Sequence, residues 1–500
     1  MKKIAFILSL FILPFIAMAG NIHVKRANKL KGGTFEGVKI NKLLGNVLMQ
    51  QENTLLYCDS AYQYLSKNEV IAFGHVRLIH NDSINASGSK LVYNGDSKVA
   101  VLSGEKVVLI DPTMRLETTN LIYNTTLGTG RYTTFGKVES DGAILTSRSG
   151  LYNSTLQYYS FYGNVDLVKD DYHLTSDTLN YSTAKKIAYY YGPTHLVSSN
   201  QCVYAEKGQY IFNNEESKIS KNAIVENNDF SIVGDSLYFN NKTSDGYGEG
   251  NVVLFAFKDS VQIEGDYAIR TGAEYKSEVY GFPVMKKLLS GDTVFLTADR
   301  LITVNDTIQK KNDIYAYNNV KVFKNDLQAV CDSLHYGVSD STLTFFTSPV
   351  LWNDKSQITA DTIKIFLNEG KLDKMKALRN AFIISEDENL NFNQVKGKEM
   401  DAQFELGQLA DVEVTGNGQS LYFANDDVTK QMMGMNKVIC SSMLIVFEKN
   451  ELNDILFRTK PESNFMPPQN IAKPDKKMKG FQWLIEKKPV MGSFERKKNI

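Results

Sequence analysis

Apolar and polar residues alternate along most of the chain, and the alternation slips by one residue at regular intervals. In residues 172–181, Leu174 and Ser176 share one face, and Leu179 and Tyr181 share a face beyond Asp177. Side chains two residues apart lie on the same side of a strand. Ser176 and Leu179 would therefore point to opposite sides of a straight strand, whereas a bulge or bend at Asp177 restores a single apolar face. The pattern predicts a bent strand.

The slip recurs in a six-residue motif of the form small, Asp, any, Leu, any, Tyr. Copies of varying quality begin at residues 58, 88, 118, 147, 176, 205, 234, 265, 298, 331, 360, 397 and 440. The sixth positions at 93, 123, 152, 181, 210 and 239 follow one another at steps of 30, 29, 29, 29 and 29 residues. A fixed period in this range is typical of a repeat architecture.

Each repeat has a second half that contains a glycine element such as Gly163-Asn164-Val165 or Gly250-Asn251-Val252. A glycine inside an alternating strand marks a bulge or a sharp bend. One repeat therefore contains about four short strand segments with two bends and two turns. The 26 Tyr and 27 Phe, against 10 Pro, also favour strands. We expect an all-β, elongated repeat array; a right-handed parallel β-helix is the alternative, because a 29-residue coil suits it.

The ends of the chain differ from the repeats. Lys2 and Lys3, an apolar run over 4–16 and Ala17-Met18-Ala19 before Gly20 predict a cleavable signal peptide over residues 1–19. Residues 473–498 contain nine Lys or Arg and three Asp or Glu. We expect a lead-in over 20–40, two parts of the array over 41–281 and 282–460 with a seam near 282–292, and a mobile, basic, proline-containing tail over 461–500.

Charge and cysteine usage exclude several classes of protein. The chain has 56 basic and 56 acidic residues, so it offers no electrostatic footprint for nucleic acid. Cys58, Cys331 and Cys440 occupy the small position of widely separated repeats, too far apart for disulfides, and are expected to be buried apolar residues. None of the six histidines has the spacing of a metal site. We expect no cofactor and no metal.

Two columns of residues recur with the period. The acidic column could form a carboxylate ladder, but a catalytic pair is needed only once, so we interpret its members as structural corners: Asp59, Asp177, Asp235, Asp266, Asp299, Asp332 and Asp361. The apolar column is expected to form the inward wall, which would become a trough for acyl chains if the interior stays open: Leu91, Tyr93, Leu121, Tyr123, Leu179, Tyr181, Leu237 and Phe239. No catalytic residue is expected.

The motifs at 176–181 and 234–237, with the Gly-Asn-Val elements at 163–165 and 250–252, resemble those of the OstA-like family over residues 40–430. This family includes the periplasmic bridge of lipopolysaccharide transport and the soluble N-terminal part of its outer-membrane partner. The resemblance implies a β-jelly roll open at both ends, whose interior carries lipid A acyl chains. It also implies edge-strand addition to inner- and outer-membrane transport proteins, and head-to-tail self-association. About thirteen copies exceed the usual single module, and no large barrel sequence follows the array.

The resulting hypothesis is a non-enzymatic lipid-binding bridge in the periplasm, with association to the outer membrane as a further expectation. Two other functions stay open at this point. A β-helical enzyme acting on surface polysaccharide would need parallel strands and a cluster of carboxylates in adjacent coils. A structural surface protein or adhesin would have no apolar ligand.

Overall fold

The computed structural model of the protein describes residues 20–35, 37–170, 172–289, 291–306, 311–405, 408–426, 428–448 and 451–496. The expected signal peptide, 1–19, lies outside these residues. The chain forms two compact units: unit 1 contains the described residues up to Ser199 and Lys207–Phe212, and unit 2 contains Asn200–Glu206 and the described residues from Asn213 onward. The division falls near residue 200, whereas the sequence pattern led us to expect a seam near 282–292.

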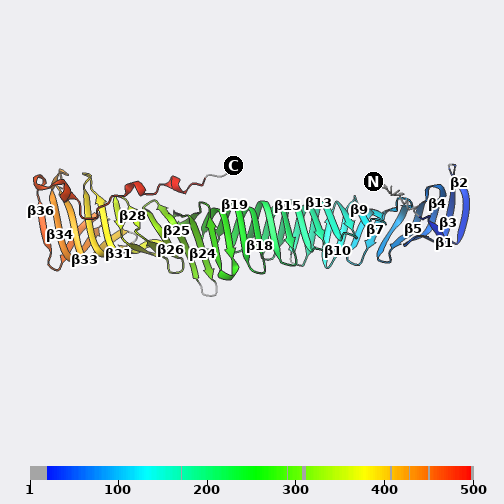
Figure 1. Cartoon of the computed structure of the whole chain (residues 1–500), viewed down its shortest axis with the longest axis horizontal. Helices are drawn as coiled ribbons and strands as arrows, with labels where there is room; N and C mark the ends of the chain where they lie inside the picture. Colours follow the sequence, from blue (N-terminus) through cyan, green and yellow to red (C-terminus); the bar gives the residue numbers. More distant parts are fainter. Residues whose placement is uncertain are drawn as a thin grey trace, which may run out of the picture. The chain divides into compact units, whose positions relative to one another are not determined.

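Unit 1 is built from strands that follow one another in chain order (Figure 1). They are β1 (His23–Arg26), β2 (Lys29–Phe35), β3 (Val38–Gln51), β4 (Thr54–Tyr64), β5 (Glu69–His80), β6 (Ile84–Asn94), β7 (Val99–Ile110), β8 (Arg115–Asn124), β9 (Thr129–Tyr132), β10 (Gly136–Ser140), β11 (Ala143–Ser147), β12 (Ser149–Asn153), β13 (Tyr158–Lys169), β14 (Tyr172–Ser182) and β15 (Ile187–Ser198). The expected lead-in thus contains β1 and β2. Strand β16 (Gln201–Ile211) contributes residues to both units.

Unit 2 continues with the same kind of element. Its strands are β17 (Glu216–Asn227), β18 (Phe230–Asn240), β19 (Asp245–Ala256), β20 (Val261–Thr271), β21 (Lys276–Tyr280), β22 (Val284–Leu289), β23 (Asp292–Thr297), β24 (Arg300–Asp306), β25 (Lys311–Lys324), β26 (Leu327–Gly337), β27 (Thr342–Phe346), β28 (Val350–Asn353), β29 (Ser356–Thr359), β30 (Thr362–Asn368), β31 (Lys371–Glu386), β32 (Phe392–Glu405), β33 (Gln408–Asn425), β34 (Met432–Glu448), β35 (Glu451–Arg458) and β36 (Glu462–Met466).

Helical structure among the described residues is restricted to 3-10 turns. These are η1 (Leu65–Lys67), η2 (Gly272–Glu274), η3 (Pro468–Asn470), η4 (Lys473–Lys476), η5 (Ile485–Lys487) and η6 (Met491–Phe494). Within the part of the chain that the structure describes, no helix has the length and apolar character needed to cross a membrane.

Neighbouring strands run antiparallel in every pairing described within either unit, for example β13 with β14 and β33 with β34. The predicted all-β repeat array is therefore confirmed. The alternative of a right-handed parallel β-helix is wrong, because short turns reverse the chain after each strand instead of carrying it round a coil.

The long strands are bent where the alternation slips. In β14, the register with β15 shifts between Thr175 and Thr178, and Asp177 is exposed while Ser176 and Leu179 are buried. The partner strand β13 bends at Gly163 and Asn164, whose φ angles of 72° and 52° lie in the left-handed region. Glycine and asparagine adopt this region most readily, which explains the recurrent Gly-Asn pair.

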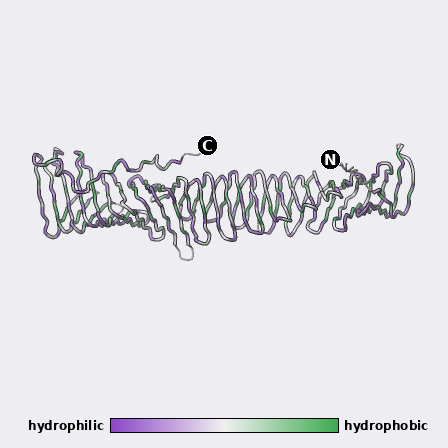
Figure 2. Tube along the Cα trace, in the orientation of Figure 1, coloured by the Kyte–Doolittle hydropathy of each residue, from purple (hydrophilic) through white to green (hydrophobic). Residues whose placement is uncertain are grey.

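The halves of the strands before and after these bends form two opposed layers, with apolar side chains between them. Polar and apolar residues alternate along the strands of both units (Figure 2). In unit 1, Leu91, Leu102 and Leu121 are 0% exposed, and in unit 2 Ile363 and Met443 are 0% exposed. The core of each unit is thus the space between its layers, as in a β-jelly roll.

The C-terminal residues were expected to form a mobile tail, but the structure places them against unit 2. Strand β36 pairs with β34, with Met466 opposite Met435. Residues 467–496, here called the C-terminal strap, then run along unit 2 across its strands (Figure 1). Apolar side chains such as Phe494, which is 3% exposed, hold the strap in place. A basic and proline-containing composition did not reveal these contacts.

Candidate functional site

The inward wall is closed in the first half of unit 1. Leu91, Tyr93, Leu121 and Tyr123 are at most 2% exposed. The Tyr93 hydroxyl donates a hydrogen bond of 2.5 Å to Oε1 of Gln51. Burial raises the pKa of Tyr123 to about 12, because its phenolate form would lose hydration among apolar side chains.

The first described residues cover this part of the interior. Gln63 Nε2 donates to the Ile22 carbonyl at 2.9 Å, and the Ile22 amide donates to Asn68 Oδ1 at 3.1 Å. Gln51, which is 2% exposed, donates to the carbonyls of Gly20 and Gly95. Buried glutamines thus tie an extended segment of the chain over the ends of the strands.

The wall is more accessible at the later copies of the motif. Leu179 and Leu237 are buried, but the ring positions Tyr181 in β14 and Phe239 in β18 are only half-buried. Tyr181 makes an edge-on contact with Phe212, with 5.7 Å between ring centroids. The same motif position is therefore sealed in one part of the array and reachable in another.

Side chains fill the space between the layers at the junction of the sealed and accessible parts of unit 1. A cavity there, lined by Met114, Tyr132, Tyr159 and Phe161 among others, has a volume of about 10 Å³. That is the lower limit for holding one water molecule. Aromatic side chains therefore leave little free space between the layers at this point.

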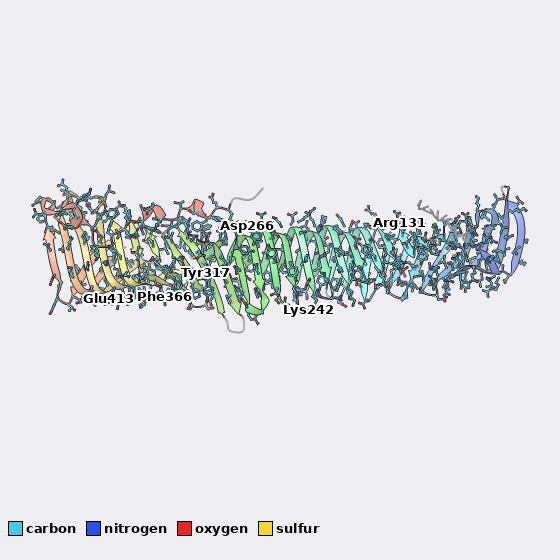
Figure 3. The ribbon with its side chains drawn as sticks, in the orientation of Figure 1. Arg131, Lys242, Asp266, Tyr317, Phe366 and Glu413 are labelled. Atoms are coloured by element: carbon cyan, nitrogen blue, oxygen red, sulfur yellow. The ribbon has the colours of Figure 1, made fainter. Side chains whose placement is uncertain are left out.

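The seven corner aspartates lie one by one along the array. Several accept hydrogen bonds from the second left-handed residue of the next strand: Asp59 with His75 Nδ1 at 2.7 Å, Asp235 with Asn251 at 3.1 Å, Asp299 with Asn319 at 3.0 Å, and Asp361 with Asn380 at 3.1 Å. Asp177 packs against Gly192, where an added Cβ would lie 2.4 Å from Oδ2. Asp332 is exposed, and Ser333 Oγ donates to it at 3.5 Å. Asp266, which is labelled in Figure 3, pairs with Arg496 of the strap.

This arrangement offers little chemistry beyond structure. The carboxylates belong to separate repeats, and among the described residues no group of three His, Cys, Asp or Glu side chains could hold a metal ion. A carboxylate that accepts a hydrogen bond from a left-handed residue of the neighbouring strand stabilises the bend, which is the role expected of a corner residue. We propose that these aspartates are structural corner residues.

Sequence reasoning missed the row of side chains that binds the strap. Gln357 Nε2 donates to the Gln482 carbonyl at 2.7 Å, and the Leu484 amide donates to Gln357 Oε1 at 2.7 Å. Gln394 repeats the arrangement with the Lys476 carbonyl and the Met478 amide, both at 2.8 Å. Each glutamine side chain therefore donates to one backbone carbonyl of the strap and accepts from one backbone amide, as the backbone of a neighbouring strand would.

The side chains of these two glutamines point away from the space between the layers, as the two-residue alternation from the nearest bend shows. In β32, Gly397 takes the inward small position, so Val395 shares its face and Gln394 points the other way. Gln394 is nevertheless 0% exposed, because the strap covers it. The inward residues Ile383 and Val395, by contrast, are half-buried. The strap thus covers the outer side of the layer and leaves this part of the interior accessible.

Aromatic contacts complete the attachment of the strap. Phe392 lies 5.4 Å from Phe481 and 5.1 Å from Trp483, measured between ring centroids. Phe494 lies 6.0 Å from both Phe295 and Phe323. The sequence signal for these contacts was present, because runs such as 350–352 (Val-Leu-Trp) and 382–384 (Phe-Ile-Ile) are apolar on both faces of a strand, which indicates burial on both sides.

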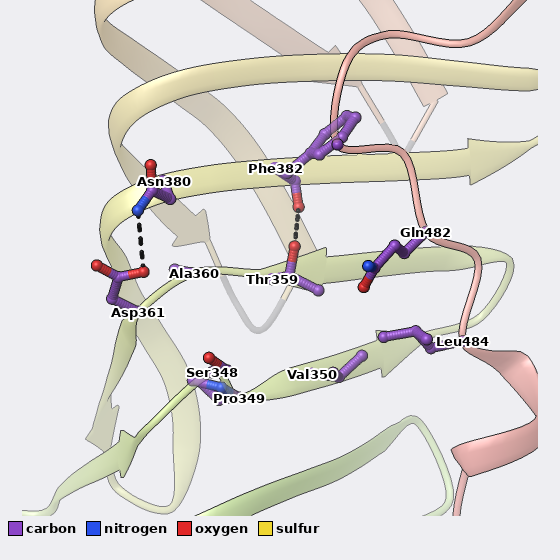
Figure 4. Close-up of a pocket in the computed structure, with 11 residues that line it drawn as sticks. Ser348, Pro349, Val350, Thr359, Ala360, Asp361, Asn380, Phe382, Gln482 and Leu484 are labelled. Atoms are coloured by element: carbon purple, nitrogen blue, oxygen red, sulfur yellow. Dashed lines mark hydrogen bonds between the residues drawn. The ribbon is translucent and has the colours of Figure 1, made fainter.

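A pocket of about 200 Å³ remains between the strap and the corner at Asp361. Figure 4 shows Val350, Phe382 and Leu484 around it, together with the hydrogen bond from Asn380 to Asp361. Its lining mixes polar and apolar groups and includes backbone at a bend. The strap therefore bridges this part of the array without filling the space beneath it.

Among the comparisons with known proteins, a family model agrees with the motif pattern. A family model described as OstA-like protein matches residues 20–177 and 173–235. A solved structure with partial similarity is LptH from Pseudomonas aeruginosa, described as the LptA homologous periplasmic component of the conserved lipopolysaccharide transport device. The similarity has 10% sequence identity, covers 24% of this chain and 84% of LptH, and has a TM-score of 0.21. No curated protein matches the chain. Residues 20–235 of this chain therefore resemble the OstA-like family.

Proposed function

We propose that this protein is a non-enzymatic, lipid-binding bridge in the transport of lipopolysaccharide to the outer membrane. The signal peptide predicted over residues 1–19 would export it to the periplasm. The family match over residues 20–235 supports the general role. The ligand in this proposal is the acyl part of lipid A, held between the two layers without covalent chemistry.

The observation that carries the proposal is the half-buried state of inward apolar side chains. Tyr181 in unit 1 and Phe239, Ile383 and Val395 in unit 2 occupy inward positions and keep part of their surface in contact with solvent. Covering such surface with a hydrocarbon chain removes apolar area from water on both sides, at about 0.8 kcal/mol for each CH₂ group buried. Burying a few methylenes against each strand contributes little binding free energy at any one strand, but the contributions of several strands add up to stable binding.

The test is photo-crosslinking in cells. A photoreactive phenylalanine derivative at Tyr181 or Phe239 replaces one aromatic ring by another at a position that already has access to the interior. We expect lipopolysaccharide adducts at both positions and none at the exposed controls His173 and Ser236, one in each unit. Folded protein without adducts at the inward positions, or with equal adducts at the controls, would overturn the proposal.

We propose that the partners bind by edge-strand addition, as the resemblance to the OstA-like family implies. Edge strands β2 in unit 1 and β36 in unit 2 would add to strands of inner- and outer-membrane transport proteins, or to a second copy of the chain head to tail. A proline at Lys31 in β2 removes a backbone donor, so it should weaken such an association without disturbing the interior. Unchanged cross-linking to neighbouring proteins in this variant would argue against edge addition through β2.

A further inference from the structure

The C-terminal strap presents an excess of cations on its exposed side. Residues 473–496 include seven Lys or Arg against three Asp or Glu. Lys473, Lys479 and Lys487 are exposed. Asp475 faces Lys437 of β34 at 3.5 Å, and Arg496 pairs with Asp266 of the array, so one acidic and one basic group of the strap already have partners. The strap is therefore a positively charged segment within a chain whose total formal charge is zero.

Exposed apolar side chains accompany these cations. Ile485, Val490 and Met491 are 45%, 65% and 40% exposed, and they flank Lys487 and Lys488. The strap has other apolar residues, including Phe481 and Phe494, that pack onto the array. Its apolar residues thus divide into a docked set and an outward set, and the outward set lies among the lysines.

The way the strap is attached fixes which side faces out. The array holds it by backbone groups, through Gln357 and Gln394, and by aromatic rings. Lys473, Lys479 and Lys487 take no part in these contacts through their side chains in the described part of the chain. Arg496 and Lys488 of the strap do bond to the array, but these three lysines do not, so their charge stays available to a partner.

We propose that the exposed side of the strap docks onto an anionic membrane surface. Lysines near such a surface attract lipid phosphates, and neighbouring apolar side chains enter the boundary between headgroups and acyl chains. The occupant is a lipid surface rather than an acidic protein because three apolar side chains stand exposed among cations. This docking is separate from lipid binding between the layers, since it uses the outer side of unit 2.

The test measures partition of the purified protein, from residue 20 onward, onto vesicles. One set contains phosphatidylcholine alone, and in the other about a third of the lipid is phosphatidylglycerol. We expect binding to the anionic vesicles that weakens with salt, and little binding to the neutral ones. Changing Lys473, Lys479 and Lys487 to Gln should weaken it roughly 100-fold, at about one kcal/mol for each lysine. Changing Val490 and Met491 to Ser should weaken the binding that remains at high salt.

A matched control removes the same charge elsewhere. Lys185, Lys221 and Lys258 are exposed residues outside the strap, and their change to Gln should leave binding unaltered. The two tryptophans, Trp352 and Trp483, both lie in the region of the strap, so unchanged fluorescence shows that a variant keeps the strap docked.

Equal binding to neutral vesicles, an equal loss in the control variant, or no vesicle binding at all would overturn the proposal. Capture of an acidic protein by the strap, without binding to vesicles, would assign the surface to a protein partner instead. Crosslinking at Tyr181 and Phe239 tests the interior separately, so failure of one proposal leaves the other standing.

Discussion

The attachment of the strap makes a quantitative prediction at Gln394. Leucine has nearly the volume of glutamine but cannot bond to the backbone, so Gln394→Leu removes the two hydrogen bonds of 2.8 Å to Lys476 and Met478. Because Gln394 is 0% exposed, water cannot readily replace these bonds while the strap stays in place. A buried hydrogen bond contributes about 0.5–1.5 kcal/mol net.

Two such bonds amount to about 2 kcal/mol, which should raise the population of the undocked strap roughly 30-fold. The layers keep their own core, so the unfolding transition of the array should change little. Native-state hydrogen exchange of residues 467–496 measures the undocking directly. Quenching of tryptophan fluorescence by acrylamide gives an independent measure, since Trp352 is 0% exposed beside Gln357 in the docked state.

The control is Gln209→Leu, a change at a half-buried glutamine of β16, which lies outside the strap. It should leave exchange in the strap unchanged. If Gln394→Leu also leaves exchange of the strap within twofold of the original protein, Gln394 does not hold the strap, and the other contacts, through Gln357, Arg496 and the aromatic rings, account for docking. If instead the whole of unit 2 becomes labile, the strap is part of its cooperative core.

Three further predictions concern the corners, the thiols and pH. Gly250→Ala should destabilise the protein by about 1–3 kcal/mol in denaturant unfolding, because φ is +73° and the new Cβ would lie 2.1 Å from a carboxylate oxygen; Gly142→Ala, with φ of +74° and open space, should cost less. At neutral pH a maleimide should label only Cys202 in the folded chain. Burial raises the pKa of the Cys58 thiol to about 12, and Cys331 and Cys440 are also buried. Rapid labelling of a second thiol would contradict this burial. Burial lowers the pKa of His80 in the folded protein, so the unfolded chain binds the proton more readily and stability should fall as the pH drops through the ordinary histidine range of about 6.5; His80→Gln should flatten that dependence, and an unchanged slope would refute the assignment.

Local features of the sequence predicted the architecture well. The slip of the alternation around Asp177 placed the bend of β14, and the Gly-Asn-Val elements placed the bends of the partner strands. Both signals are local because a strand has a side-chain period of two and because few residues tolerate a left-handed φ. The motif period likewise predicted the repeat, and its order along the chain indicated the OstA-like family.

Accessibility of the wall depended on contacts between distant residues. Tyr93 and Tyr181 occupy the same position of the motif, yet Tyr93 is sealed because Gln51 and residues 20–22 cover it, and Tyr181 keeps part of its surface exposed. Both copies have Leu at the fourth position of the motif and Tyr at the sixth. Only the tertiary structure decides which copy receives a cover.

The strap shows the same division. By itself, the sequence determined the strands, their bends, their period and the basic composition of residues 461–500. It did not determine that those residues are docked, because Gln357 and Gln394 find their partners 125 and 82 residues away. Their burial depends on a surface that exists only after the strands have paired, so tertiary structure alone decided where the C-terminal segment lies and which of its side chains face outward.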